Sequence, residues 1–477
     1  MHKTAVEVHE MEDSMYNRLR SASLVVAIAA ASGTVVWSQA PRRPPQSPHL
    51  AAPDNLVAVR AGRMFDAKAG TMLNNQIILI KGDRIADIGP SVHIPPEARV
   101  IDLSGATVLP GMIDGHVHNA GRGDSVEMKT IVMVQSAARD LEAGFTTTVD
   151  MDSRGGFGTV DLRDAINEGL IKGPRMQVSG QSLNQRASGP YPNPGPGFYS
   201  GFTENKNING PWLARAAVRE SKLHGVDWIK IYTTQDFVGS RELYEFKPDG
   251  SLTAYPSLTL EEVQAIVDEA HRMGLKVACH TYGGEGMRSC INAGVDLSMH
   301  VTELYKDDAL LNTVVQKKLP IMMTIDDLAG LNAGDKRLLA NLGFTGDKAV
   351  TRLGMAELTF RKLHKAGVPL PFGSGAVAGD GAFPHGKQAD QFAWMVKWGM
   401  TPTQALQTAF MTEANVLNYN WANRVGSLEK GKFGDVIAVA GNPLTDVTEM
   451  ERVKFVMKGG VVVKNDLGPR PPSTAAQ

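Results

Sequence analysis

The chain has 477 residues, and its 49 lysine and arginine residues against 50 aspartate and glutamate residues give a formal net charge of −1. This near-neutral balance argues against a nucleic-acid partner or an anionic membrane surface. Hydrophobic residues make up 43% of the chain, enough for one large domain and a smaller one. The two cysteines, Cys279 and Cys290, exclude a C-x-x-C metal site and a disulfide framework, and we expect two buried thiols.

The first 40 residues have the pattern of an export signal. Two arginines precede the apolar run "SASLVVAIAAASGTVVW", and "SQA" ends at Ala40 with the small residues that a signal peptidase needs. We expect residues 1–40 to be a signal peptide, the mature chain to lack an integral membrane span, and the protein to be periplasmic or secreted. The alternative is a cytoplasmic protein with a frayed arm. The Pro-rich residues 41–54 are expected to be a linker, and residues 466–477 a disordered tail.

Short β-rich runs stand near both ends of the chain. "NLVAVRAGRMFD", "NQIILIKGDRIADIG" and "ARVIDLSGATVLPG" come first, and "FGDVIAVAG" and "VKFVMKGGVVVKND" come last, with Gly and Asp turns between them. The pattern predicts a small β-sandwich domain made from residues 55–107 and 421–465, closed by both termini around an inserted α/β body.

The body, residues 108–420, contains eight apolar, β-branched runs: "ATVLPGMIDGHVH", "FTTTVDM", "PRMQVSG", "DWIKIYTT", "LKVACHTYG", "VDLSMHV", "LPIMMTID" and "VPLPFGSGA". Amphipathic helical stretches such as "SLTLEEVQAIVDEAHRMG" separate most of them. Eight parallel strands with helical crossovers predict a (β/α)8 TIM barrel, in which reactive residues lie at the carboxyl ends of the strands.

Histidines and one lysine occupy several of these expected strand ends: His116, His118, Lys230, His280 and His300. His116 and His118 are two residues apart on a strand, so both imidazoles point to the same side. A lone core histidine is more often structural than a ligand. Four histidines at three strand ends instead favour a divalent-metal site, because neutral imidazoles bind such ions well.

Lys230 lies inside the apolar strand "WIKIY", where a charge costs several kcal/mol unless it is paired or neutralised. One interpretation is a salt bridge to a barrel carboxylate. The other is a neutral lysine that carries CO2 as a carbamate, whose two oxygens would bridge two metal ions.

The motifs "VLPGMIDGHVH", "DWIKIY", "VACHTYG" and "VGSLEKGKFGDVIAVAGNPL" resemble those of the metal-dependent amidohydrolase superfamily. Within it, "LEAGFTTTVDM" and "PHGKQADQF" are similar to the imidazolonepropionase-like and prolidase-like branch, which includes Xaa-Pro and Xaa-Arg dipeptidases. The resemblance covers residues 55–465 and implies a TIM-barrel hydrolase of carbon–nitrogen bonds with two divalent ions. The imidazole-rich set of candidate ligands favours zinc, with manganese or cobalt tolerated.

The resemblance also implies a role for each strand-end residue. His116 and His118 would bind the more buried ion, and His280 and His300 the more exposed one. Carboxylated Lys230 would bridge the two ions. A hydroxide held between two metals is a nucleophile at neutral pH, and it would attack the carbonyl of a small-molecule amide.

The chain departs from the superfamily at strand eight, where "GTDA" or "GSDA" carries an aspartate that binds metal and moves the proton. This sequence reads "GSGA", with Gly375 in the aspartate's place. Asp380 in the same loop and Asp326 in "MTIDD" are candidate replacements, and the alternative for each is a solvated loop residue. Tyr232, on the same side of its strand as Lys230, is a candidate to steady the oxyanion, or else a packed core tyrosine.

The loop after strand three, "SGQSLNQRASGPYPNPGPGFYSGFTENKN", is long and suggests a lid or a wall for an apolar substrate group. Arg186, Tyr191 and His385 are candidates to hold a substrate carboxylate, or are ordinary surface residues. The favoured function is hydrolysis of a dipeptide or N-acyl amino acid. The alternative is a metal-binding protein whose catalysis is weakened or lost through Gly375. A mononuclear deaminase is disfavoured because it has no need of Lys230, and a homo-oligomer is left open.

Overall fold

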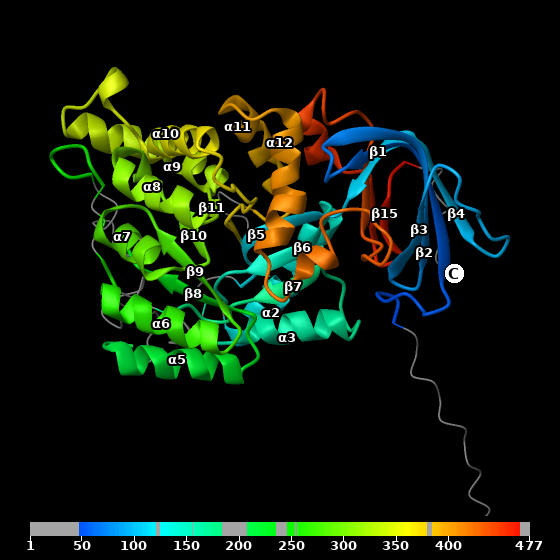
Figure 1. The fold of residues 1–477 in the computed structure, drawn as a ribbon, viewed down its shortest axis with the longest axis horizontal. Helices are drawn as coiled ribbons and strands as arrows, with labels where there is room; N and C mark the ends of the chain where they lie inside the picture. Colours follow the sequence, from blue (N-terminus) through cyan, green and yellow to red (C-terminus); the bar gives the residue numbers. More distant parts are fainter. Residues whose placement is uncertain are drawn as a thin grey trace, which may run out of the picture. The chain divides into compact units, whose positions relative to one another are not determined.

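The computed structural model describes residues 47–120, 125–154, 156–183, 208–234, 246–252, 254, 256–378 and 384–467. Within these ranges the strands form one seven-stranded sheet and two four-stranded sheets (Figure 1).

The seven-stranded sheet is built from both ends of the described chain. Its order is β15-β14-β13-β4-β1-β2-β3, with β1 at Leu56–Asp66, β2 at Thr71–Lys81, β3 at Arg84–Gly89, β4 at Arg99–Pro110, β13 at Val436–Val439, β14 at Phe455–Lys458 and β15 at Val461–Asn465. Strand β4 joins the two ends, because it pairs in parallel with β1 and antiparallel with β13. The seven described strands of these two ends belong to a single hydrogen-bonded sheet, so the predicted sandwich of two layers stays a prediction.

Seven of the eight predicted runs of the body contain a strand, whereas the eighth, residues 368–376, only reaches the first residue of β12. The eight strands form two parallel sheets, β12-β5-β6-β7 and β11-β10-β9-β8. Their bounds are β5 Met112–His118, β6 Phe145–Asp150, β7 Arg175–Val178, β8 Trp228–Tyr232, β9 Lys276–Thr281, β10 Leu297–His300, β11 Ile321–Met322 and β12 Ala376–Val377. Backbone bonds of Leu183 with Lys230 and Tyr232 connect the two sheets on one side. A closed barrel of eight strands stays a prediction.

Helices alternate with these strands and lie on their outer side (Figure 1). They are α2 (Val126–Glu142), α3 (Gly158–Asn167), α5 (Pro211–Leu223), α6 (Leu260–Arg272), α7 (Gly284–Ala293), α8 (Asp308–Lys317), α9 (Ile325–Asn341), α10 (Arg352–Lys365), α11 (Gln391–Lys397), α12 (Pro402–Gln407) and α13 (Glu413–Val416). Helix α6 lies within the stretch 257–274 that the sequence predicts to be helical, and a reciprocal capping box of Thr259 and Glu262 fixes where it begins.

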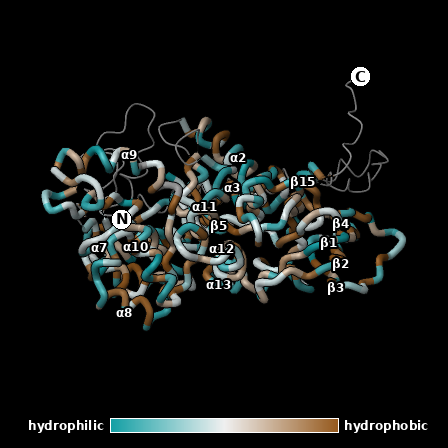
Figure 2. The backbone as a smooth tube through the Cα atoms, turned by 90° about the horizontal axis from the view of Figure 1, so that it is seen from above, coloured by the Kyte–Doolittle hydropathy of each residue, from teal (hydrophilic) through white to brown (hydrophobic). Residues whose placement is uncertain are grey.

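Hydrophilic and hydrophobic residues are interspersed along these helices, as Figure 2 shows. Such a pattern suits helices with one face on a core and the other in water. None of the helices in the described ranges is both long enough and apolar enough to cross a bilayer.

The two parallel sheets share one apolar core. It includes Ile113, Val149, Trp228, Leu297 and Met322, all without exposed surface. These side chains come from both sheets, so their contact holds the strand ends of one sheet next to those of the other.

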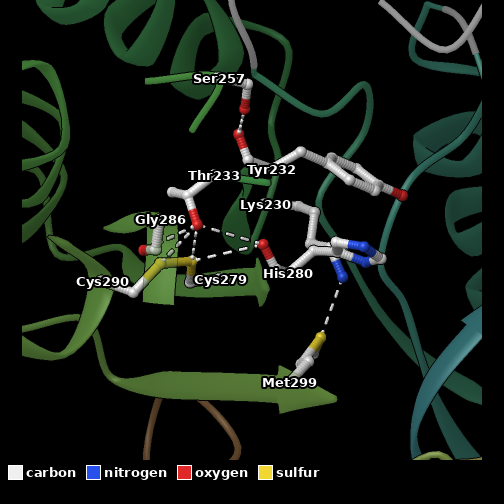
Figure 3. Close-up of a disulfide and its surroundings, with 9 residues drawn as sticks. All are labelled: Lys230, Tyr232, Thr233, Ser257, Cys279, His280, Gly286, Cys290 and Met299. Atoms are coloured by element: carbon white, nitrogen blue, oxygen red, sulfur yellow. Dashed lines mark hydrogen bonds between the residues drawn. A yellow bond between two sulfur atoms is a disulfide. The ribbon is translucent and has the colours of Figure 1, made fainter. Parts of the chain in front are cut away.

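The expectation of two buried thiols is wrong, because a disulfide joins Cys279 of β9 to Cys290 of α7 (Figure 3). Both residues are fully buried. The turn from β9 into α7 brings their Cα atoms to 6.3 Å, within the range that a disulfide spans. An eleven-residue separation in the sequence does not reveal this proximity. The hydroxyl of Thr233 lies 3.3 Å from one sulfur and 3.0 Å from the other.

A mostly buried ion pair attaches the seven-stranded sheet to the body. The guanidinium of Arg175, on β7, donates to both carboxylate oxygens of Asp435, next to β13, at 2.8 and 3.1 Å. Arg175 also lies over the ring of Phe433 at 3.4 Å, and Arg84 lies 3.6 Å from the same ring centroid. Two cations therefore contact one aromatic ring at the junction.

Replacing Asp435 with Asn should destabilise the protein by about 3 kcal/mol, because it leaves the Arg175 charge without its partner in a mostly buried place. Urea unfolding followed by circular dichroism measures the change. Glu357→Gln is the control, since it breaks an exposed pair with Arg361 on α10 and should cost at most about 0.5 kcal/mol. Equal effects of the two changes would contradict the assignment of a structural role to the Asp435 pair.

Candidate active site

The predicted histidine pair at the end of β5 is buried and in direct contact. His116 is 1% exposed and His118 is 4% exposed, and their Nε2 atoms lie 3.2 Å apart. The pairing of β5 with β6 is irregular between Asp114 and Val117. Asp114 links the end of β5 to the segment before β12, because its carboxylate accepts hydrogen bonds from the backbone N–H of His116 and from the hydroxyl of Ser374.

The other predicted residues come to the same place from three more strands. Lys230 Nζ lies 3.5 Å from His116 Nε2. It also lies 2.9 Å from the sulfur of Met299 (Figure 3). The rings of His280 and His300 are 4.3 Å apart, and His300 is 5.4 Å from the ring of His116. The structure thus brings together the predicted residues of β5, β8, β9 and β10.

Three of the histidines are held in the neutral form. Burial lowers the pKa of His116, His280 and His300 well below the usual value, and neighbouring positive charge, including that of Lys230, lowers each pKa further. Neutral imidazole is the form that binds a metal ion.

Neighbouring groups orient two of the imidazoles. His118 Nδ1 lies 3.3 Å from the backbone carbonyl of Asp152, and His300 Nδ1 lies 2.6 Å from the hydroxyl of Thr324. A partner on one ring nitrogen fixes the ring and leaves the other nitrogen for a ligand role. His300 has a φ of 70°, which is strained for a non-glycine residue and is typical of functional sites.

Tyr232 faces the histidine cluster, as predicted, but it has a partner that the sequence reasoning missed. Its ring lies 4.4 Å from that of His280, and its hydroxyl donates to the Asp152 carboxylate at 3.3 Å. Asp152 also accepts from the backbone N–H groups of Arg154 and Ser182. Asp152 and Arg154 follow the end of β6, so the rule that found the histidines would also have found them had it been applied to every polar residue at a strand end.

Gly375 has a structural reason to be glycine. Its φ is +75°, in the region that other residues rarely adopt, and its N–H donates to the carbonyl of His116 at 2.7 Å. A Cβ added there would lie 3.4 Å from the nearest side-chain atom of Thr324, which is ordinary contact. The backbone, rather than lack of space, disfavours a side chain at this position.

The two candidate replacements for the missing aspartate are not placed by the structure. Asp380 lies outside the described residues. Asp326 falls in the first turn of α9 rather than on a strand, and its side chain is outside what the structure describes. The long loop with Arg186 and Tyr191 also lies outside the described residues.

The prediction that His385 holds a substrate carboxylate needs correction. Its ring is buried, with Nδ1 2.8 Å from the Asp140 carboxylate and Nε2 3.1 Å from the carbonyl of His118. Burial lowers the pKa of His385, but the charge of Asp140 and the hydrogen bond to it together raise the pKa by more. The net shift of the pKa is therefore upward. His385 therefore ties the chain after strand eight to α2 and β5, with both ring nitrogens engaged by protein groups.

The side chains of the cluster are of the kinds that bind a metal ion, but their positions match a metal site only in part. Two nitrogens bound to one zinc ion at about 2.0–2.1 Å stand about 3.3 Å apart at tetrahedral geometry, close to the 3.2 Å between His116 and His118. Within the described ranges, however, no group of three or more His, Cys, Asp or Glu side chains is arranged to hold an ion. Each predicted ligand set contains only two histidines, so Lys230 would have to supply the third ligand.

Comparison with known proteins places the chain among amidohydrolases. A model of the amidohydrolase family matches residues 107–463. The ochratoxinase of Aspergillus niger is 26% identical over 434 residues, which cover 84% of this chain and 85% of that protein.

Solved structures give the same relationship. A Xaa-Pro dipeptidase with methionine bound in its active site has 31% identity and a TM-score of 0.71, covering 86% of this chain and all of that one. A putative prolidase from Bifidobacterium longum has 26% identity and a TM-score of 0.68, covering 86% of this chain and 95% of that one. Since these chains are covered almost completely, the similarity extends over the whole body rather than over one motif.

Replacing Gly375 with Asp should lower the stability of the protein by about 1–2 kcal/mol, because a left-handed backbone penalises any Cβ. Thermal unfolding of the variant and of Gly375→Ala measures this cost. The two variants should be destabilised alike, since both carry the same Cβ. A Gly375→Asp protein as stable as the wild type would show that the backbone there accepts the superfamily's aspartate.

Proposed function

Because the chain belongs to the amidohydrolase family and is therefore a hydrolase of carbon–nitrogen bonds, we propose that it is a metal-dependent enzyme that cleaves the amide bond of a dipeptide or an N-acyl amino acid. One observation carries this proposal: four buried imidazoles and a buried lysine, from β5 of one parallel sheet and β8, β9 and β10 of the other, meet at the strand ends. Burying so many polar groups costs free energy, and a ligand that binds them offsets that cost.

In this proposal His116 and His118 would hold one divalent ion, and His280 and His300 would hold a second. Carboxylated Lys230 would be a ligand to both. Zinc suits a site rich in imidazole better than magnesium or calcium do. The bound ions would lower the pKa of water toward about 7 and polarise the amide carbonyl.

The chain's own residues position the substrate and exclude water. The ring of Tyr232 lies against His280, and in the structure its one hydroxyl proton is donated to the Asp152 carboxylate. To stabilise the oxygen of the cleaved carbonyl, that proton would turn from Asp152 to the substrate. The histidines, Lys230 and Tyr232 are all buried, so charges that develop here during reaction are screened less than in water.

The proton needs a carrier, since Gly375 has no side chain. We propose Asp380, five residues along the same loop, for this role. General acid–base help is worth about 10²–10⁴-fold, so Asp380→Asn should lose most of the turnover. The alternative function, a metal-binding protein with weakened or lost catalysis, is favoured specifically by the glycine at this position.

The relatives support the choice of an amide substrate. The solved relative of highest identity named above is a Xaa-Pro dipeptidase, with methionine in its active site. A dipeptide and an N-acyl amino acid both present an amide next to a carboxylate-bearing carbon, so one site can be tested with both.

Purified protein should contain close to two divalent ions per chain, measured by plasma mass spectrometry. His116→Ala and Lys230→Ala should each lose at least one ion, because each removes a proposed ligand. Glu357→Gln, which alters an exposed ion pair on α10, is the matched control and should keep both ions. Full metal content in Lys230→Ala would eliminate the proposed bridge.

Wild-type protein should hydrolyse at least one member of a panel of Xaa-Pro, Xaa-Arg and N-acyl amino-acid substrates. Amine release, followed with an amine-reactive dye, measures turnover. Full metal occupancy without turnover on any member, in the wild type and in Gly375→Asp, would favour the metal-binding function over the enzyme.

We also propose that residues 1–40 direct export, from the apolar run and the "SQA" sequence. Intact mass spectrometry of protein recovered from its native host should then find a chain that starts just after Ala40. A mature chain that retains these residues would show that the segment is not a cleaved signal.

A further inference from the structure

A cavity of about 490 Å³ lies between the seven-stranded sheet and the body, within the size range of small-molecule sites. The sheet contributes Lys81 and Lys458 to its wall, and the body contributes the end of α3 and Arg175. Arg175 is the first residue of β7, whereas the histidine cluster lies at the carboxyl ends of the parallel strands. The cavity is therefore separate from the candidate active site.

Lys458 is a buried lysine in the cavity wall that the proposed mechanism does not use. It is 8% exposed, and its Nζ donates to the carbonyl of Gly173 at 2.6 Å, its one hydrogen bond within the described residues. Burial and the nearby charge of Arg175 lower the pKa of Lys458 to about 7, against the opposing charge of Asp435. An anion bound beside this amine would restore its full charge. A perturbed lysine that lines a cavity is therefore a candidate ligand-binding group.

The carboxylates next to the cavity already have arginine partners. Asp435 pairs with Arg175 at 2.8 Å, and Asp83 lies 3.3 Å from Arg84. The two wall lysines, in contrast, have no carboxylate within 4 Å in the part of the chain that the structure describes. The cavity thus offers two ammonium groups to a negative charge supplied by a ligand.

Another part of the wall is apolar. Leu50 and Ile166 line the cavity, and 39% of the Leu50 surface is exposed. A bare phosphate or sulfate ion would interact with the lysines and leave this apolar surface in contact with water. An organic anion with an apolar body would cover it, which is favourable. The wall therefore suits a ligand with one charged end and one apolar end.

We propose that this junction cavity binds a small organic carboxylate, with the carboxylate group on Lys458 and Lys81 and the apolar body on Leu50 and Ile166. The inference does not depend on the proposed function, because the cavity shares no wall residue with the histidine cluster. It assigns the protein a second small-molecule site, at the junction of the sheet and the body.

Titration calorimetry on the full-length protein tests the proposal with three probes: hexanoate, its neutral analogue hexanamide, and inorganic phosphate. Hexanoate should bind at least tenfold more tightly than either of the others, because hexanamide lacks the charge and phosphate lacks the apolar body. Lys458→Met should weaken hexanoate binding by about 10- to 100-fold, the range of one charge-assisted hydrogen bond. Binding of hexanamide should change less than threefold.

The pH dependence of hexanoate binding tests Lys458 without a substitution. The affinity should be constant below about pH 7 and should fall above it by up to tenfold per pH unit, because the neutral amine must take up a proton to hold the anion. The other charged or titratable side chains around the cavity are Arg175, Asp435, Lys81, Asp83 and His49. His49→Gln should keep this profile, and Lys458→Met should flatten it.

Two controls locate the binding. His116→Ala removes a proposed metal ligand and should bind hexanoate like the wild type, which separates this site from a carboxylate held by metal ions. Lys430→Met removes an exposed lysine outside the cavity and should also bind normally. If Lys458→Met does not fold, which circular dichroism reveals, the pH profile and Lys81→Met still decide. The latter should weaken binding about two- to fivefold, because Lys81 is exposed.

Hexanoate binding no tighter than that of hexanamide or phosphate would overturn the proposal. So would equal effects of Lys458→Met and Lys430→Met, loss of binding in His116→Ala, or an affinity that does not change with pH. Because these measurements do not involve turnover, hexanoate binding that depends on Lys458 would stand even if the protein hydrolysed no amide.

Discussion

Burial of a polar cluster at the ends of parallel strands is the constraint on which the rest of this structure depends. Lys230 has no exposed surface, and the histidines beside it are nearly as buried. Charged imidazoles there would repel Lys230 without water to screen them, so burial holds His116, His280 and His300 neutral. Burial of the cluster costs folding free energy, but it also makes the histidines good metal ligands, because metal binding requires the neutral ring.

The surroundings of the cluster are built to keep it in place. The carbonyl of Asp152 and the hydroxyl of Thr324 each contact one ring nitrogen, and the Gly375 N–H donates to the His116 carbonyl. Behind β9, the disulfide and the Thr233 hydroxyl lock the segment that precedes His280 (Figure 3). The apolar core shared by both parallel sheets supports all of these contacts from below. A substitution in any of these supporting groups would therefore change the orientation of the histidines rather than their charge.

At the tip of strand eight, the backbone conformation favours glycine over the aspartate that the chemistry of related enzymes uses. At φ +75° and with its N–H donated to His116, residue 375 helps position a proposed ligand through its main chain. An aspartate there would regain a carboxylate but would strain the turn. His385 makes a similar contribution from the next turn, since its imidazole joins Asp140 to the carbonyl of His118. The chain around the missing aspartate is therefore organised to hold β5.

The sequence by itself determined seven of the eight strand positions, the two β-rich ends and the five residues of the cluster, because strand periodicity and the strand-end rule are local patterns. The eighth strand, β12, begins only at the last residue of its predicted run. Only the tertiary structure decided the rest. The Cys279–Cys290 disulfide, the pairing of His385 with Asp140 and the contact of Tyr232 with Asp152 join residues whose separation in sequence carries no such information. Their proximity depends on how strands and helices pack, and the positive φ of Asp152 and His300 is imposed by that packing against their own local preference.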